Sequence, residues 1–251
     1  MQANYTRLNN ILGWLVFAIA AFTYFSTIEP TVSFWDCGEY IATSVKLQVG
    51  HPPGAPFFQL MGAAFAQFAL GDATKHALMV NSLSALSSAF TILFLFWTIT
   101  ALGRKLSRHY GELSQARIIS IFSAGIVGAL AYTFSDSFWF SATEGEVYAM
   151  SSFFTALAFW AILKWEEEVE NSGKANRWLI FIGYMMGLAI GVHILVFLTI
   201  PAIVMVYFFK LRNDINTRTF LLYNAIGVLV LGIVFAAIIP LILNMFGKLE
   251  I

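Results

Sequence analysis

The chain has 251 residues, of which 59% are hydrophobic and only 11% are charged. A soluble domain carries about 25% charged residues, so this composition excludes a water-soluble globular protein and indicates a polytopic membrane protein. The formal net charge is zero and gives no argument for a nucleic-acid partner. The single cysteine, Cys37, excludes an internal disulfide.

The first apolar run covers 11–28 and follows a short polar start that contains Arg7. The tripeptide "AIA" at 18–20 resembles a signal-peptidase site, but the run continues through it into "AFTYF" without a polar region. About 20 apolar residues suffice to cross a bilayer. We therefore expect an uncleaved first spanning helix.

The next segment, 29–76, is polar except for "APFFQLMGAAFAQFAL" at about 55–70. This apolar run is short for a full crossing and has polar flanks. It predicts a helix that lies at the membrane interface or dips into it.

Four further runs predict single crossings, at 77–102, 118–134, 147–163 and 219–243. The run 178–209 is too long for one crossing, and Gly, His and Pro residues interrupt it. Because Gly and Pro punctuate helices, we divide it into two short helices that meet near Gly191–His193. The predicted fold is all-α, with seven transmembrane helices and one outer interfacial helix in a single module covering 1–251.

The basic residues support this topology. If the amino terminus is cytoplasmic, the inner segments are 1–10, 103–117, 164–177 and 210–218, and they hold eleven of the fourteen Lys and Arg residues. That distribution follows the positive-inside rule. The acidic cluster "KWEEEVE" at 164–170 is expected to be a solvated helical end on the inner side.

The first outer loop contains "FWDCGEYIATSVKLQVGHPPGAP". Asp36 and Glu39 are three residues apart, which places both on one face of a helix. The motif "HPPGAP" builds a stiff turn that holds His51 at the surface before an apolar helix. Each feature has an alternative. Asp36 and Glu39 could belong to an ordinary solvated loop with a helix cap, and His51 could be only a turn residue.

The second outer loop, 135–147, again combines acids with aromatic residues in "SDSFWFSATEGEV". Glu144 has an alternative role as the acid that opens the next helix. Glu146 enters the apolar run, where an ionised group is costly without a partner or water, so we favour a functional role for it. His193 lies in the outer turn between two short helices, and a histidine with only structural hydrogen bonds is its alternative.

An acid-bearing first outer loop, the "HPP" turn and a seven-helix module together resemble the GT-C glycosyltransferases. The motifs "FWDCGEYIATSVKLQVGHPPGAPFFQLMGAAFA", "FWFSATEGEVYAMSSFF" and "GLAIGVHILVFLTIPA" are similar to a bacterial family of transmembrane proteins related to an animal protein O-mannosyltransferase. Members of that family are usually longer. The chain is therefore expected to be an amino-terminal fragment.

The resemblance implies transfer of a sugar, mannose or another hexose, from a polyprenyl-phosphate donor to protein Ser or Thr hydroxyls. It implies a bacterial inner membrane, with the active site facing the periplasm or exterior. Asp36 and Glu39 are the expected catalytic residues, and both could serve as the base. Asp36 occupies the position of the superfamily's catalytic acid, whereas Glu39, one turn on, is better placed to orient Lys46 or a metal. The expected donor-phosphate or acceptor-binding residues are Lys46, His51, Glu144, Glu146, Tyr148 and His193.

The sequence does not decide whether a divalent cation takes part. The carboxylates of the two outer loops suit Mg²⁺ or Mn²⁺, and Asp36 and Glu146 are the expected ligands if one binds. Two other functions stay open: a secondary transporter, whose sites lie near the midplane between inverted repeats, and a non-catalytic subunit of a membrane assembly.

Overall fold

The structure, a computed structural model, describes residues 2–108, 110–111, 113–212, 216–241 and 244–245. Every regular element within these ranges is helical. The long helices are α1 (Gln2–Ser26), α4 (His76–Arg108), α5 (Gln115–Thr133), α7 (Val147–Ser172), α8 (Asn176–Ile190), α9 (Ile200–Leu211) and α10 (Thr217–Ile233). The short elements are α2 (Cys37–Lys46), α3 (Pro56–Ala66), η1 (Gln67–Ala69), η2 (Ala73–Lys75), α6 (Asp136–Thr143), η3 (Ile194–Thr199) and the π-helical η4 (Val234–Ile238).

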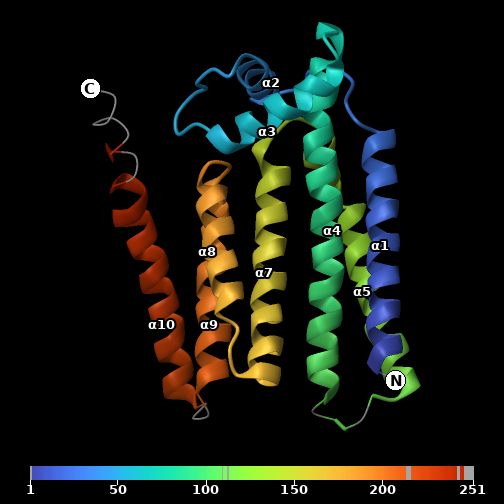
Figure 1. The fold of residues 1–251 in the computed structure, drawn as a ribbon, viewed down its shortest axis with the longest axis vertical. Helices are drawn as coiled ribbons and strands as arrows, with labels where there is room; N and C mark the ends of the chain where they lie inside the picture. Colours follow the sequence, from blue (N-terminus) through green and yellow to red (C-terminus); the bar gives the residue numbers. More distant parts are fainter. Residues whose placement is uncertain (1, 109, 112, 213–215, 242–243, 246–251) are drawn as a thin grey trace.

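The long helices stand side by side, and α2 and α3 lie across the upper end of the bundle (Figure 1). Helix α4 is central, because it packs most extensively against α1, α5 and α7. Its buried face alternates small side chains such as Ser84, Ala85, Ser88 and Ala89 with larger ones. Small residues let helix backbones approach closely where lipid, rather than water, surrounds the bundle.

Six helices within the described residues are long and apolar enough to cross a membrane. They cover Asn4–Ser26, Ala73–Ser107, Gln115–Thr133, Val147–Ser172, Ile194–Leu211 and Thr217–Leu241. Helix α8 is apolar but has only 15 residues. The predicted count of seven crossings therefore depends on α8, whereas the expected break of the run 178–209 is present at Gly191–His193.

The apolar run near 55–70 forms α3 and the 3₁₀ turn η1, and it lies across the bundle rather than along it (Figure 1). The amides of Phe57 and Phe58 donate to the Gly191 carbonyl over 2.7 and 3.1 Å. Pro56, at the start of α3, has no amide to satisfy. The first turn of α3 is thus fixed to the turn that follows α8.

One short helix was not expected. The segment 135–147 was predicted as the second outer loop, and within it Asp136–Thr143 forms the helix α6. Its Phe138 is buried and stacks on Tyr132 of α5 with ring centroids 4.2 Å apart, and it also contacts Tyr24 of α1. Phe138 therefore packs inward against neighbouring helices, whereas Phe140 of the same helix is 49% exposed.

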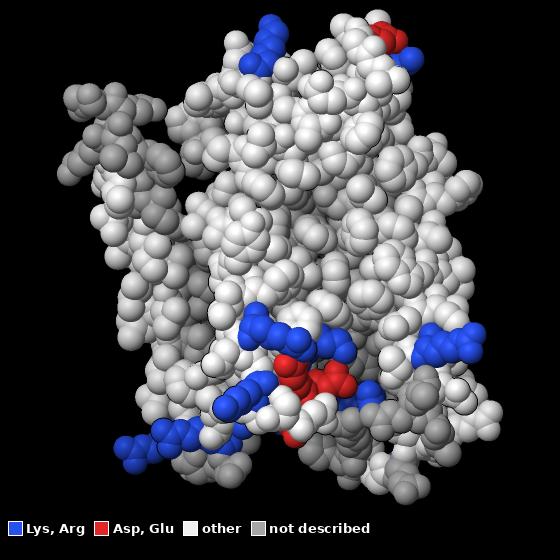
Figure 2. Space-filling view, in the orientation of Figure 1, with Lys and Arg blue, Asp and Glu red and all other residues white. Residues whose placement is uncertain are grey.

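Charged side chains gather at the two ends of the visible face, and an uncharged band separates them (Figure 2). The acids of "KWEEEVE" are on α7, which continues as predicted to Ser172. They were expected to be simply solvated, but all four of them bind bases of other helices. Lys105 pairs with Glu166, Arg104 with Glu167, Arg177 with Glu168 and Lys210 with Glu170.

Replacing Gly191 with Ala should destabilise the fold. A Cβ at this position would lie 2.8 Å from the Phe57 Cβ and 3.0 Å from its backbone nitrogen, so α3 must shift. We expect a loss of about 1–3 kcal/mol, as for other overpacked sites. Gly187→Ala is the matched control, because a Cβ there meets nothing within 4 Å, and it should be neutral or slightly stabilising. Thermal unfolding in detergent measures both variants; equal melting temperatures would contradict the docking described for α3.

Labelling with a membrane-impermeant maleimide tests the predicted sidedness. Val49 is 93% exposed near the α2 end, whereas Lys174 is exposed at the other end, between α7 and α8. Cys37 is fully buried and should stay unlabelled. We expect Val49→Cys to react in intact cells and Lys174→Cys to react only after permeabilisation. Reaction of both, or of Lys174→Cys alone, in intact cells would contradict the topology.

Candidate functional site

The first part of the candidate site lies at the start of α2. Asp36 is the residue before the helix, but its side chain makes no capping hydrogen bond to the helix amides. Trp35 just before it has a positive φ of 61°, which sets the direction in which the chain enters α2. The Asp36 side chain is 58% exposed. Its carboxylate is therefore available to a ligand.

Glu39 and His51 form a close pair. The His51 amide donates to Glu39 Oε1, and His51 Nδ1 lies 3.0 Å from Glu39 Oε2. The hydrogen bonds from His51 lower the pKa of Glu39, and the same carboxylate raises the pKa of His51. The other ring nitrogen, Nε2, lies 3.8 Å from Asp36 Oδ2. The histidine thus connects the two acids that the sequence analysis singled out.

A glycine permits this close approach. A Cβ on Gly50 would lie 2.9 Å from Glu39 Oε1 and 3.3 Å from Gln59 Nε2. Gln59, on α3, is 8% exposed, and its Nε2 is buried without a hydrogen-bond partner. The sequence analysis did not include Gln59 among the site residues. Its signal in the sequence was one of two side-chain amides, Gln59 and Gln67, within the apolar run at 55–70.

The second part of the site is the tripeptide Glu144–Gly145–Glu146, which precedes α7. Both glutamates are 5% exposed. The Ser84 hydroxyl donates to the Glu146 carbonyl at 3.4 Å. A Cβ on Gly145 would lie 2.9 Å from Asn81 Oδ1. The tripeptide therefore lies directly against α4.

The charges of the two glutamates would be poorly stabilised in this buried position. Burial raises the pKa of Glu144, which accepts a hydrogen bond from Ser33 while its Oε2 has no partner. Burial, followed by repulsion from Glu144 and Asp36, raises the pKa of Glu146 to about 7. A carboxyl group that titrates near neutral pH is suited to exchange protons.

Tyr148 and His193 extend the site along α7. Their ring centroids are 5.3 Å apart. His193 precedes η3, and its Nδ1 accepts a hydrogen bond from the Leu195 amide at 3.3 Å. Burial lowers the pKa of His193. An acceptor at Nδ1 leaves the proton of a neutral ring on Nε2, so this histidine serves as a neutral donor rather than a cation.

Lys46 stands apart from this arrangement. It lies in the last turn of α2 and is exposed. Glu39 was expected to orient Lys46 or a metal, but in the structure it binds His51 instead. No ion pair of Lys46 is present within the part of the chain that the structure describes.

Asp36, Glu39 and His51 could together hold a metal ion. One ligand atom from each lies within 4.8 Å of the others. Two carboxylates with one imidazole suit Mn²⁺ better than Mg²⁺, which prefers oxygen ligands alone. The expected partner of Asp36 was Glu146, whereas the group found among the described residues contains Glu39 and His51.

Two further residues shape the site. Tyr40 lies between the two parts of the site. The centroid of its ring is 6.0 Å from that of His51, and burial raises the pKa of Tyr40 to about 12.

Asn81 of α4 is fully buried and donates to the carbonyls of Glu29 and Thr31 over 2.6 and 3.0 Å. A side-chain amide within an apolar helix is energetically costly unless it forms hydrogen bonds. The position of Asn81 within the apolar run 77–102 was therefore a signal visible in the sequence.

Together these features define an integral membrane protein with a carboxylate-rich site at one end of its helical bundle. The profile of the family described as "Protein O-mannosyl-transferase TMEM260 N-terminal domain" matches residues 36–217, well over half of the chain. The chain belongs to this family. The matched region begins at Asp36 and contains every candidate site residue named above.

Two curated relatives carry the same description. "Protein O-mannosyl-transferase tmem260" of Dictyostelium discoideum is 26% identical over 143 residues, which are 57% of this chain and 16% of the relative. "Protein O-mannosyl-transferase TMEM260" of Mus musculus is 28% identical over 153 residues, which are 61% of this chain and 19% of the relative. The match thus spans less than a fifth of these relatives. No solved structure matches the chain.

Glu146→Gln should change stability in a pH-dependent manner. The folded-state pKa is raised from 4.5 to about 7, so ionised Glu146 destabilises the fold fully above pH 7 and not at all below about pH 4.5. The variant should therefore melt several degrees higher than the wild type at pH 8, and the difference should vanish near pH 4.5. Asp72→Asn is the control, because hydrogen bonds lower the pKa of Asp72 and its loss should not stabilise. An equal gain for Glu146→Gln at both pH values would contradict a buried charge.

Proposed function

We propose that this chain forms the amino-terminal catalytic part of a GT-C-type membrane glycosyltransferase. The reaction is transfer of a hexose, mannose by the family's name, from a polyprenyl-phosphate donor to Ser or Thr hydroxyls of a protein. The family match supports this class of activity. The observation that carries the proposal is the cluster of Asp36, Glu39 and His51 beside the buried Glu146.

The chemistry requires a base and a stabiliser of the leaving group. The acceptor hydroxyl oxygen attacks the anomeric carbon of the sugar while the bond from that carbon to the phosphate oxygen breaks, and its electron pair leaves with the polyprenyl phosphate. Asp36 takes the hydroxyl proton, because its carboxylate is exposed and makes no capping bond. His51, kept protonated by Glu39, faces the phosphate.

If a divalent cation binds, it would be held by Asp36, Glu39 and a neutral His51, and it would then supply the positive charge to the leaving phosphate in place of the protonated imidazole. Glu39 is then a ligand as well as the partner of His51. Tyr148 and the neutral His193 provide hydrogen-bond donors to the acceptor or donor beside this cluster. The site would face the periplasm or exterior of a bacterial inner membrane, with the amino terminus in the cytoplasm.

A groove below Tyr148 suits the lipid chain of the donor. It has a volume of about 420 Å³ and lies between α4, α5 and α7. Its lining is largely apolar, with scattered hydroxyl groups, and runs along α7 from Tyr148 to Phe159. Leu195, two residues from His193, also lines it. A polyprenyl chain in this groove would bring its phosphate toward the carboxylate cluster.

Asp36→Asn should lower sugar transfer by at least ~100-fold, the lower range for a lost general base. Donor binding should survive, because the substitution removes negative charge next to a phosphate. The measurement is transfer of labelled mannose from polyprenyl-phosphate mannose to a Ser/Thr peptide, in membranes that contain the complete protein. Asp72→Asn, the same change at an exposed acid paired with Lys75, should leave transfer unchanged. Near-normal transfer by folded, inserted Asp36→Asn would remove Asp36 from the mechanism.

Glu39→Gln should act differently. It removes the carboxylate that raises the pKa of His51, so the imidazole should lose its proton at lower pH. We expect a smaller fall in kcat than for Asp36→Asn and a KM for the donor that rises between pH 6 and pH 8. The pH dependence of KM in both variants separates the two roles. If Glu39→Gln leaves the KM profile unchanged, His51 does not bind the phosphate as a cation.

A further inference from the structure

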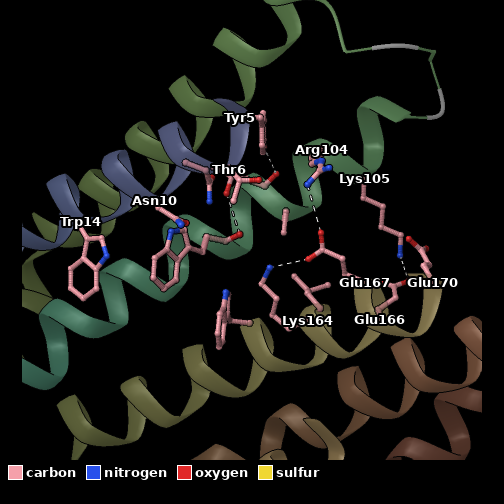
Figure 3. Close-up of a pocket in the computed structure, with 16 residues that line it drawn as sticks. Tyr5, Thr6, Asn10, Trp14, Arg104, Lys105, Lys164, Glu166, Glu167 and Glu170 are labelled. Atoms are coloured by element: carbon pink, nitrogen blue, oxygen red, sulfur yellow. Dashed lines mark hydrogen bonds and ion pairs between the residues drawn. The ribbon is translucent and has the colours of Figure 1, made fainter. Parts of the chain in front are cut away.

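A second pocket lies at the opposite end of the bundle, between α1, α4 and α7 (Figure 3). Its volume is about 430 Å³. The wall contributed by the three helices is aromatic and contains Trp14, Trp97 and Trp160. The rim is charged and includes Arg104, Lys164 and Glu167. Neither the proposed reaction nor its groove uses any of these residues.

The pocket holds polar atoms that the protein does not satisfy. Among the lining residues, Arg104 Nε is a buried donor and Asn9 Oδ1 a buried acceptor, and neither has a hydrogen-bond partner. An unpaired buried donor or acceptor costs about 1–3 kcal/mol. Two such groups among the residues of one cavity favour a ligand with polar atoms.

The charges on the rim favour an anion. Glu167 is shared by two cations: Arg104 lies 3.6 Å from one of its oxygens and Lys164 lies 2.9 Å from the other (Figure 3). Of the neighbouring acids, Glu166 binds Lys105 and Glu170 binds Lys210. Arg104 and Lys164 thus face the same carboxylate, an arrangement that an additional anion would complement. A phosphodiester carries one negative charge.

The aromatic wall favours a lipid. Trp97 lies 6.2 Å from Trp14 and 5.8 Å from Trp160, measured between ring centroids. Trp14 is 49% exposed and belongs to a face of α1 that also exposes Ile11 and Leu15. Tryptophan beside basic side chains at the end of a spanning helix is typical of the level of lipid headgroups. A ligand that reaches this pocket from the bilayer meets the apolar face first.

We propose that this pocket binds the headgroup of a membrane phospholipid. The phosphodiester accepts hydrogen bonds from Arg104 and Lys164, and the glycerol region lies against Trp14 and Trp97. A soluble phosphate ester would accept the same hydrogen bonds from Arg104 and Lys164 but would not pack against Trp14 and Trp97 in the same way. The inference does not depend on the proposed glycosyltransferase activity.

Native mass spectrometry of the detergent-purified protein tests this proposal, with a dissociation constant measured for phosphatidylglycerol and for soluble glycerol phosphate. Lys164→Gln should raise the constant for the lipid roughly tenfold, as expected for a lost hydrogen bond to a charged group. Ala101→Phe, which fills the pocket without changing charge, should abolish the one-lipid adduct. Lys174→Gln is the matched control, because Lys174 is exposed at the same end but does not line the pocket.

Glycerol phosphate should not bind at concentrations that saturate the lipid site. Equal lipid binding by wild type, Lys164→Gln and Ala101→Phe would overturn the proposal, provided that all three melt as folded proteins. Glycerol phosphate binding as tight as that of the lipid would also overturn it, because the pocket would then recognise a soluble phosphate ester. If Lys164→Gln does not fold, the uncharged Ala101→Phe decides alone.

Discussion

The candidate site depends on one buried amide. Asn81 lies near the start of the central helix α4, is fully buried, and binds the carbonyls of Glu29 and Thr31 in the link between α1 and α2. Its Oδ1 lies 4.0 Å from the Cys37 thiol and against the Cα of Gly145. A single side chain therefore positions both acid-bearing segments. In a low-dielectric surrounding an unsatisfied amide is expensive, so the segments around Asn81 are constrained to one arrangement.

The acidic residues at the two ends of the bundle lie in different electrostatic environments. On α7, Glu166 and Glu168 are paired with bases from α4 and α8. At the other end, Glu144 and Glu146 precede the same helix with no Lys or Arg ion pair among the described residues, and burial raises the pKa of both. A carboxylate buried without a cation reduces the stability of a fold, whereas a paired one avoids most of that cost. Retaining that cost at one end only is typical of a functional site.

Much of the fold could be predicted from the sequence, because hydrophobic length and the position of Gly and Pro directly determine where helices run. The break at Gly191–His193 and the short helix near 55–70 are examples. Helix α6 was missed because eight residues are too few for a hydropathy pattern, and because its Phe138 is buried by α1 and α5 rather than by lipid. The aromatic residues were visible, but the partners that bury them lie far away along the chain.

The sequence identified residues of the candidate site, but it did not predict which of their side chains contact each other. The sequence predicted Asp36, Glu39, His51 and Glu146 on one side, yet it suggested Lys46 or a metal as the partner of Glu39. Twelve residues separate Glu39 from His51, and their contact is possible because Gly50 has no side chain to keep them apart. Such a contact depends on the path of a loop, which a pattern of residue types does not determine.

The pairing would also help an acidic site to accept the phosphate of the proposed donor. Glu39 raises the pKa of His51 and so favours the charged imidazole that would offset its own charge, and Glu146, with a pKa of about 7, is largely protonated on the acidic side of neutrality. Asp36 is 3.8 Å from the shared histidine and is left as the carboxylate able to take a proton. In the proposed reaction, the repulsion that these three acids would exert on the donor phosphate is thereby reduced, while Asp36 is kept as the base.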